Sequence, residues 1–283
     1  MKRSVGWVCL ALVVGLWGGP GAGSVPRGER TLRVAAAASL RHALEEVVSA
    51  FREVRPDVAV EVTYGASGTF YAQILNRAPL DLFLSADVDY PRQVMERGLA
   101  LPDSFFVYAT GRLALWVRRE SPLEVEKAGM EVLRHPSVRH IAVANPRLAP
   151  YGRAAVEVLR RTGLYEAVAD RLVYGENVNQ VAQFAESGAA DVGILPLSMV
   201  VASPLRAAGR FWVVPADWHS PIEHGGVLLK WVRDPAAAWA FRAFLLGERG
   251  QAILSRHGLG ARHLSSKNPH TGYASCILHP CLT

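Results

Sequence analysis

The chain has 283 residues, half of them hydrophobic, which is enough for a large core in one or two domains. Its formal charge of +6 is spread along the sequence, without the Lys/Arg clusters and interleaved aromatic residues of a nucleic-acid-binding protein. The three cysteines are too few for a disulfide framework. Composition therefore excludes a nucleic-acid-binding protein and a small disulfide-stabilised protein.

Residues 1–23 predict a secretory signal peptide. Lys2 and Arg3 precede an apolar run from Val5 to Trp17, and the small residues GGPGAGS follow. The run is shorter than the roughly 20 apolar residues of a membrane span. Cys9 lies inside it rather than behind a cleavage site, so we expect no lipid anchor. The prediction is an exported, soluble protein whose formal charge falls to +4 when Lys2 and Arg3 are removed.

Strands and helices alternate from Leu32 onward. We expect strands at 32–38, 58–64 and 80–86 and helices at 40–54 and 68–78. The succession of strands and helices with short connections favours a mostly parallel, doubly wound α/β sheet.

The same alternation restarts at Arg112. We expect strands at 112–118, 139–146, 171–175, 190–200, 210–215 and 223–232, helices at 152–162 and 179–187, and two final helices ending near Gly258. No Gly/Ser linker separates the two blocks, so crossover strands should join them. The prediction is a discontinuous first lobe at 31–111 and 216–261 and a second lobe at 112–215.

Residues 262–283 break this pattern, being polar and holding Cys276 and Cys281. Cys-x₄-Cys with scattered histidines is a weak zinc pattern. We therefore interpret this segment as a disordered tail, with or without a local disulfide.

Four strand–loop–helix junctions place small or uncharged residues at a helix start: AAASL (36–40), YGASGTF (64–70), NPRLAPYGRAA (145–155) and YGENVNQV (174–181). Open α/β sheets bind ligands at such junctions, outside the carboxyl ends of the strands. Each helix start exposes unpaired N–H groups and about half a positive charge. Several of them facing one space would form an anion site without Lys or Arg.

Taken singly, the residues at these junctions have simpler interpretations. Ser39 fits a helix N-cap and Ser67 a turn residue. Tyr151 fits a surface or interlobe aromatic residue, and Val178 a helix-packing residue. As a set they predict an anion site in which the two serines add hydroxyl donors and the other two residues add backbone N–H groups.

The sequence also leaves other functions open. An exported enzyme is disfavoured because no Gly-x-Ser-x-Gly or His-Glu-x-x-His motif is present, and GASGT matches the first only loosely. His219, His224 and His257 are scattered, and each fits a surface or hydrogen-bonded histidine better than a catalytic base. A sensory domain of a regulator is disfavoured by the export signal and by the absence of a helix-turn-helix segment.

Seven segments, in order, resemble the periplasmic molybdate-binding proteins of ABC importers: VAAAASL, VTYGASGTFYAQI, PLDLFLSADVDY, VANPRLAPYGRAAVEVL, GENVNQVAQFAESGAADVGILPLS, WHSPIEHGGVLL and FLLGERGQAIL. The resemblance runs from about Thr31 to Ala261 and does not reach the tail. It implies a type II periplasmic binding protein with two α/β lobes that close on molybdate or tungstate. It also implies a non-enzymatic, periplasmic monomer without a cofactor, which delivers the anion to an inner-membrane ABC permease.

The resemblance implies specific ligand-binding positions. They are Ala38 and Ser39 in the first loop, Ser67 in the second, and the backbone N–H groups of Tyr151 and Val178. The chain departs from the family at Pro196, where some members offer a tyrosine hydroxyl. Proline has no donor, so this contact is lost or replaced.

A site built only of hydrogen-bond donors would select against protonated oxyanions. An oxyanion that keeps a proton presents an O–H without an acceptor, which costs about 1–3 kcal/mol. The nearby candidates for an acceptor are Asp81, Asp87 and Glu176. We interpret Asp81 and Asp87 as turn or capping residues and Glu176 as a residue that complements a helix dipole, with a ligand role for Glu176 as the alternative. Sulfate is separated from molybdate only by cavity size, so it remains an alternative ligand.

Overall fold

The computed structural model describes residues 30–201 and 204–260. The expected signal peptide at 1–23 and the expected tail at 262–283, with its cysteines, lie outside the described residues. Within the described part of the chain, no helix is both long enough and apolar enough to cross a bilayer.

The first sheet has the strand order β2-β1-β3-β10-β4. Its strands are β1 (Arg30–Ala37), β2 (Val58–Gly65), β3 (Leu82–Leu84), β4 (Phe106–Gly111) and β10 (Ile222–Leu228). The first three pair in parallel, whereas β10 is antiparallel to both of its neighbours. The sheet is therefore mixed, with the parallel strands at one side.

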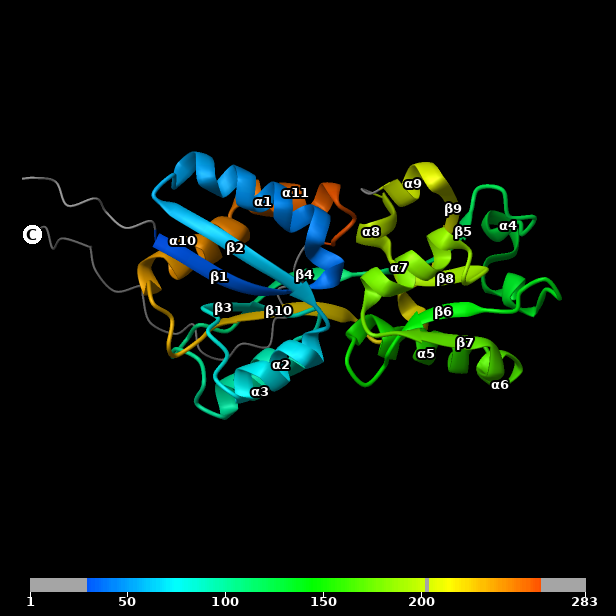
Figure 1. Ribbon diagram of the computed structural model, residues 1–283, viewed down its shortest axis with the longest axis horizontal. Helices are drawn as coiled ribbons and strands as arrows, with labels where there is room; N and C mark the ends of the chain where they lie inside the picture. The colour runs from blue at the N-terminus through cyan, green and yellow to red at the C-terminus, as the bar shows by residue number, and fades with distance from the viewer. Residues whose placement is uncertain (1–29, 202–203, 261–283) are drawn as a thin grey trace, which may run out of the picture.

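The second sheet has the order β7-β6-β8-β5-β9. Its strands are β5 (Leu113–Arg118), β6 (Ile141–Ala144), β7 (Leu172–Gly175), β8 (Val192–Pro196) and β9 (Gly209–Val213). Again β7, β6 and β8 are parallel, and β5 is antiparallel to β8 and β9. The chain crosses between the sheets after β4 and returns after β9 (Figure 1). We call the first sheet with its helices the first lobe, and the second sheet with its helices the second lobe.

Helices cover both faces of the first sheet. On one face lie α1 (Arg41–Val54), α10 (Pro235–Leu246) and α11 (Glu248–Arg256), and on the other α2 (Ser67–Leu75) and α3 (Asp89–Glu96) (Figure 1). Val34 and Ala36 of β1 belong to one core cluster and Ala35 to another. Because both faces are buried there, the second half of β1, residues 34–37, is an apolar run rather than an alternating one.

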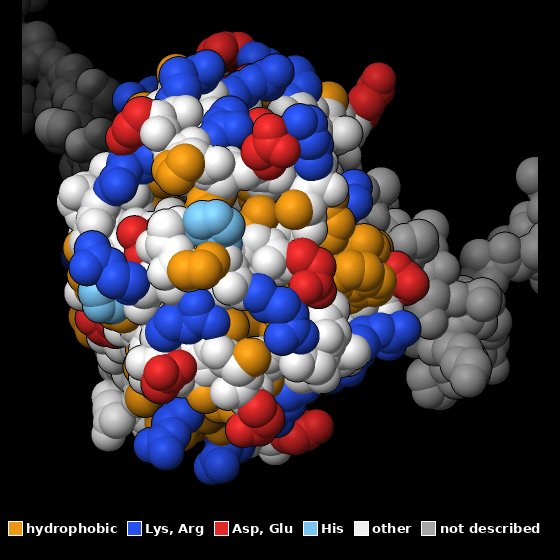
Figure 2. All heavy atoms as spheres, turned by 90° about the vertical axis from the view of Figure 1, so that its right-hand side faces the viewer, with side chains coloured by type: hydrophobic (Ala, Val, Ile, Leu, Met, Phe, Trp, Pro, Cys, Tyr) orange, Lys and Arg blue, Asp and Glu red, His pale blue; other side chains and the backbone are white. Residues whose placement is uncertain are grey.

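The second sheet is covered by α5 (Pro150–Arg161) and α6 (Tyr165–Val168) below and by α7 (Val178–Ser187), α8 (Leu197–Val201) and α9 (Pro204–Ala208) above, with α4 (Val125–Ala128) at its far end (Figure 1). Figure 2 shows this end of the molecule, where Lys/Arg and Asp/Glu side chains are interspersed. Basic and acidic side chains therefore lie next to one another on this face.

Several elements differ from the sequence expectation. The strand expected at 190–200 ends at Pro196, and Leu197–Val201 form the helix α8. Helix α3 and strand β4 were not expected at all. The strand was predicted too long at its C-terminal end because a short apolar run fits a buried helix as well as a buried strand.

Candidate functional site

The five residues singled out in the sequence, Ala38, Ser39, Ser67, Tyr151 and Val178, line one cavity between the lobes. Its other lining residues are Ala37, Gly65, Ala66, Ala86, Ala149, Pro150 and Asn177. No charged side chain is among these described residues. The empty volume is about 210 Å³, part of it open to solvent.

Of the described helices, α2, α5 and α7 begin at this cavity, at Ser67, Pro150 and Val178. None of the three has an acidic residue in its first turn. The N–H groups of Ser67, Tyr151 and Val178 have no acceptor among the described residues. Three uncompensated positive helix ends and their free N–H groups therefore meet at one place.

Neither serine caps a helix. Ser39 lies in a 3₁₀ turn (Ala38–Leu40) before α1 and makes no capping bond, so its interpretation as an N-cap is wrong. Its Oγ is buried and has no hydrogen-bond partner among the described residues. Ser67 is the first residue of α2, and its Oγ accepts from Ala86 N at 3.1 Å. That bond uses a lone pair and leaves the Ser67 hydroxyl hydrogen free to donate.

Helix α7 has a side-chain cap that the sequence analysis missed. Asn177 Oδ1 accepts from Asn179 N at 2.9 Å and from Gln180 N at 3.3 Å. The cap satisfies the second and third N–H groups of the helix, so the N–H of Val178 stays available. An asparagine directly before an apolar helix is an N-cap signal that could have been used.

The Tyr151 hydroxyl is bonded to a histidine of the first lobe. It shares a hydrogen bond of 3.2 Å with Nε2 of His224 on β10. Gly111 makes room for it, since a Cβ there would overlap the hydroxyl oxygen. Burial raises the pKa of Tyr151 and lowers the pKa of His224 to about 3, so both groups are neutral at ordinary pH. The backbone N–H of Tyr151 has no acceptor among the described residues and is available to a ligand.

The three carboxylates considered as acceptors do not line the cavity. Asp81 accepts from Arg33 N at 2.8 Å and from Arg233 N at 3.1 Å. Asp87 accepts from Tyr90 N in the first turn of α3 and pairs with Arg153. Glu176 is exposed. The cavity therefore offers donors without a carboxylate acceptor from its described walls.

Pro196 ends β8 and adds no donor. The nearby Ser198 donates its hydroxyl to the Ser39 carbonyl at 2.9 Å and is not part of the cavity wall. Ser198 therefore does not replace the missing tyrosine donor.

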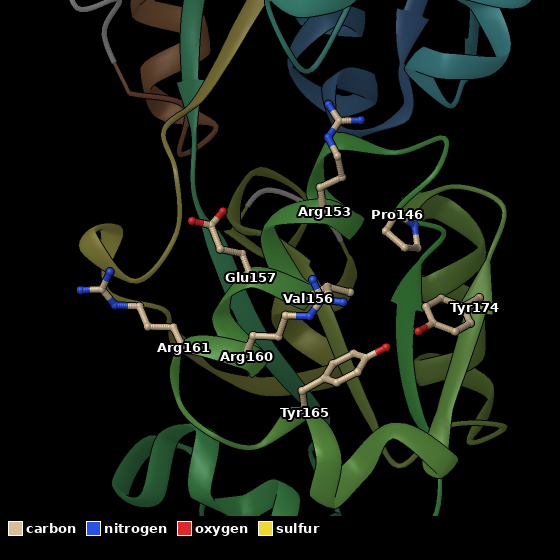
Figure 3. Close-up of a pocket in the computed structure, with 8 residues that line it drawn as sticks. All are labelled: Pro146, Arg153, Val156, Glu157, Arg160, Arg161, Tyr165 and Tyr174. Atoms are coloured by element: carbon tan, nitrogen blue, oxygen red, sulfur yellow. The ribbon is translucent and has the colours of Figure 1, made fainter.

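A larger hollow lies elsewhere, on the second lobe (Figure 3). It has an empty volume of about 1020 Å³ and is lined by Pro146, Arg153, Val156, Glu157, Arg160, Arg161, Tyr165 and Tyr174. None of the five candidate residues lines it. Its size does not make it the candidate site, because it lacks the convergent helix starts.

Comparison with known proteins gives consistent matches. The family described as bacterial extracellular solute-binding protein matches residues 32–260. The molybdate-binding protein ModA of Rhodobacter capsulatus is 37% identical over 253 residues, which are 89% of this chain and 94% of that protein. The solved periplasmic molybdate-binding protein of Azotobacter vinelandii matches with a TM-score of 0.77 and 34% identity, over 82% of this chain and 100% of its own.

A second solved structure, the substrate binding domain of a putative molybdenum ABC transporter from Clostridium difficile, matches with a TM-score of 0.64 and 31% identity. It covers 82% of this chain and 99% of its own. The two mixed sheets with flanking helices thus confirm the expected type II periplasmic binding protein fold. The chain belongs to the bacterial extracellular solute-binding protein family and is a homologue of the molybdate-binding ModA proteins.

Proposed function

We propose that this protein captures molybdate, and also tungstate, outside the cytoplasm. The observation that carries the proposal is the interlobe cavity, where three helix starts and two serine hydroxyls meet without a charged side chain among the described lining residues. Its ligand-binding residues are Ala38, Ser39, Ser67, Tyr151 and Val178. Similarity to molybdate-binding relatives over most of the chain supports the choice of anion.

A cavity that offers only donors should distinguish oxyanions by whether they carry a proton. Molybdate, tungstate and sulfate present acceptor oxygens alone, whereas hydrogen phosphate and protonated arsenate each present an O–H. An unmatched buried polar group costs about 1–3 kcal/mol, so the protonated anions bind more weakly. Sulfate is rejected only if the cavity suits the larger anion, which makes sulfate the alternative ligand to test.

The expected contacts suffice for tight binding. About five to seven hydrogen bonds to a charged ligand, at about 1.5–3 kcal/mol each, exceed 10 kcal/mol before the cost of association. A dissociation constant between micromolar and nanomolar, about −8 to −12 kcal/mol, is therefore attainable.

The protein then acts as a binding protein and not as an enzyme. Ser67 Oγ is hydrogen-bonded to Ala86 N, and His224 is bonded to Tyr151, so no described serine–histidine pair is set up at the cavity. We propose a periplasmic monomer that delivers its anion to an inner-membrane ABC permease. No cofactor is required for that role.

Competition calorimetry with molybdate, tungstate, sulfate and phosphate tests the function. We expect one-to-one binding of molybdate and tungstate, with weaker sulfate and much weaker phosphate. Molybdate at 1,000 times its dissociation constant stabilises the fold by about 4.1 kcal/mol. At about 2–4 °C per kcal/mol, the melting temperature should rise by roughly 8–16 °C. Tight binding of sulfate or an organic anion, with no heat from molybdate or tungstate, would reject the proposal.

A further inference from the structure

An ion pair joins the two lobes beside the cavity. Asp87 lies between β3 and α3 in the first lobe, and Arg153 lies in the first turn of α5 in the second lobe. Figure 3 shows the Arg153 side chain extending toward the blue elements of the first lobe, whereas Arg160 and Arg161 stay over the second lobe. The pair breaks when the lobes separate.

The carboxylate of Asp87 is held in position before Arg153 reaches it. Only 8% of Asp87 is exposed. Its Oδ1 accepts from Ser85 Oγ at 3.0 Å and from Tyr90 N at 3.1 Å, and Oδ2 accepts from Arg153. Because Ser85 and Tyr90 belong to the same lobe as Asp87, this acceptor keeps its orientation whether or not the second lobe is docked.

Other contacts between the lobes surround the pair. The Arg153 guanidinium lies 5.6 Å from the ring centroid of Tyr90, whose hydroxyl donates to the Arg147 carbonyl at 3.3 Å. Gly68 N donates to the Leu148 carbonyl at 2.9 Å. All of these contacts join the start of α2 or α3 to the start of α5 or the loop before it, so they form and break together with the ion pair.

The pair adjoins the cavity without being part of its wall. Ala86 and Pro150 line both the cavity and a neighbouring hollow, whereas Asp87 and Arg153 line that hollow but not the cavity. Asp87 directly follows the cavity residue Ala86 in the sequence, and Arg153 lies two residues after the cavity residue Tyr151. Closure around an anion therefore brings the carboxylate and the guanidinium together.

We propose that Asp87 and Arg153 form an interlobe latch that holds the loaded, closed state and sets the rate at which the anion leaves. This inference rests on the proposed binding function but concerns residues that do not contact the anion. The pair is partly shielded, with side-chain exposures of 11% and 41%. Its effect should lie between that of an exposed ion pair and that of a buried one.

The test compares Arg153→Ala with Arg160→Ala. Arg160 lies two turns further along α5, and its guanidinium stacks over Tyr165 at 5.0 Å within the second lobe. Both changes remove one arginine from the same helix, but only the first removes an interlobe contact. The wild-type protein is titrated with molybdate, tungstate, sulfate and phosphate, and the tightest anion is used in radiolabelled form.

Release is followed during a chase with excess unlabelled anion. We expect Arg153→Ala to release the anion about tenfold faster than wild type, equivalent to about 1.4 kcal/mol, and Arg160→Ala to match wild type within about twofold. Combining Arg153→Ala with Asp87→Asn should be no faster than the faster single variant, because both remove the same contact. The amide oxygen introduced by Asp87→Asn can still accept from Ser85 and Tyr90, which keeps the local fold.

Release from Arg153→Ala at the wild-type rate would overturn the latch, as would multiplication of the two single effects in the double variant. The titration judges the proposed function separately. A preference for sulfate or phosphate rejects molybdate capture while the latch is still tested with that anion. Binding of none of the four anions overturns both.

Discussion

At the scale of single residues, the two cavity serines should respond differently to removal of the hydroxyl. Ser39 Oγ has no partner among the described residues, whereas Ser67 Oγ accepts from Ala86 N. We expect both Ser39→Ala and Ser67→Ala to weaken molybdate binding by about 10- to 100-fold, the worth of a hydrogen bond to a charged group. Only Ser67→Ala should also lower the free energy of unfolding, by about 1–3 kcal/mol, because Ala86 N–H loses its acceptor.

Calorimetry with molybdate gives the affinities of these variants, and urea unfolding without anion gives their stabilities. Ser39→Ala serves as the matched control for Ser67→Ala, since both delete one hydroxyl from the same cavity. Equal losses of stability in the two variants would contradict this division of roles.

Burial of His224 predicts a pH dependence of stability. The folded-state pKa of about 3 lies below the ordinary value of 6.5, so between these values the unfolded chain binds more protons than the folded one. The contribution is complete above about pH 6.5, and the free energy of unfolding falls as the pH is lowered toward 3. The slope from one group is at most about 1.4 kcal/mol per pH unit.

His224→Gln isolates this effect, because glutamine can still bond to the Tyr151 hydroxyl but does not titrate. Urea unfolding at about pH 7, 6 and 5 should show a steeper loss of stability in wild type than in the variant. Parallel pH profiles for the two proteins would show that His224 does not become charged on unfolding in this range.

At the scale of elements, the start of α7 combines a cap with a cavity wall. Asn177 caps the helix and lines the cavity. Asn177→Asp keeps an equally good cap, so the free energy of unfolding should change little, but it places a negative charge beside the anion. We expect its molybdate affinity to fall more than tenfold.

Asn177→Ala is the matched control, because it removes the cap without adding charge. It should lose about 1 kcal/mol of stability. Urea unfolding and calorimetry separate the two effects. Wild-type affinity in Asn177→Asp would mean that the charge at this helix start does not face the anion.

The helix starts at the cavity also show how much of the site could be predicted from the sequence. Ser67 and Val178 follow strands that were recognised as parallel, and the ends of parallel strands lie at one edge of a sheet, so their helix starts could be placed near a common space. Leu197–Val201 could not be assigned, because five apolar residues have no distinguishing period. The Ser39 hydroxyl is left free to face the cavity because Ser39 lies in the 3₁₀ turn before α1. The AAASL pattern does not distinguish that turn from an N-cap.

At the scale of the whole molecule, the contacts that join the lobes were invisible in the sequence. Asp87 and Arg153 are 66 residues apart and belong to different sheets, so no local pattern pairs them. The Ser198 hydroxyl reaches the Ser39 carbonyl across 159 residues. The two-lobe division follows from alternating strands and helices, but the contacts between the lobes depend on how the crossover strands set one sheet against the other.

These contacts predict how the molecule responds to its ligand. The cavity takes Ser39 and Ser67 from the first lobe and Tyr151 and Val178 from the second, so only a closed arrangement presents all four to one anion. A ligand that binds the closed state more tightly shifts the population toward it. Small-angle scattering should therefore show a smaller radius of gyration with saturating molybdate than without it. Phosphate at the same concentration is the control and should cause less compaction, because its protonated form is a poor match for a site of donors. An unchanged radius at a molybdate concentration where calorimetry shows full occupancy would mean that binding does not require closure.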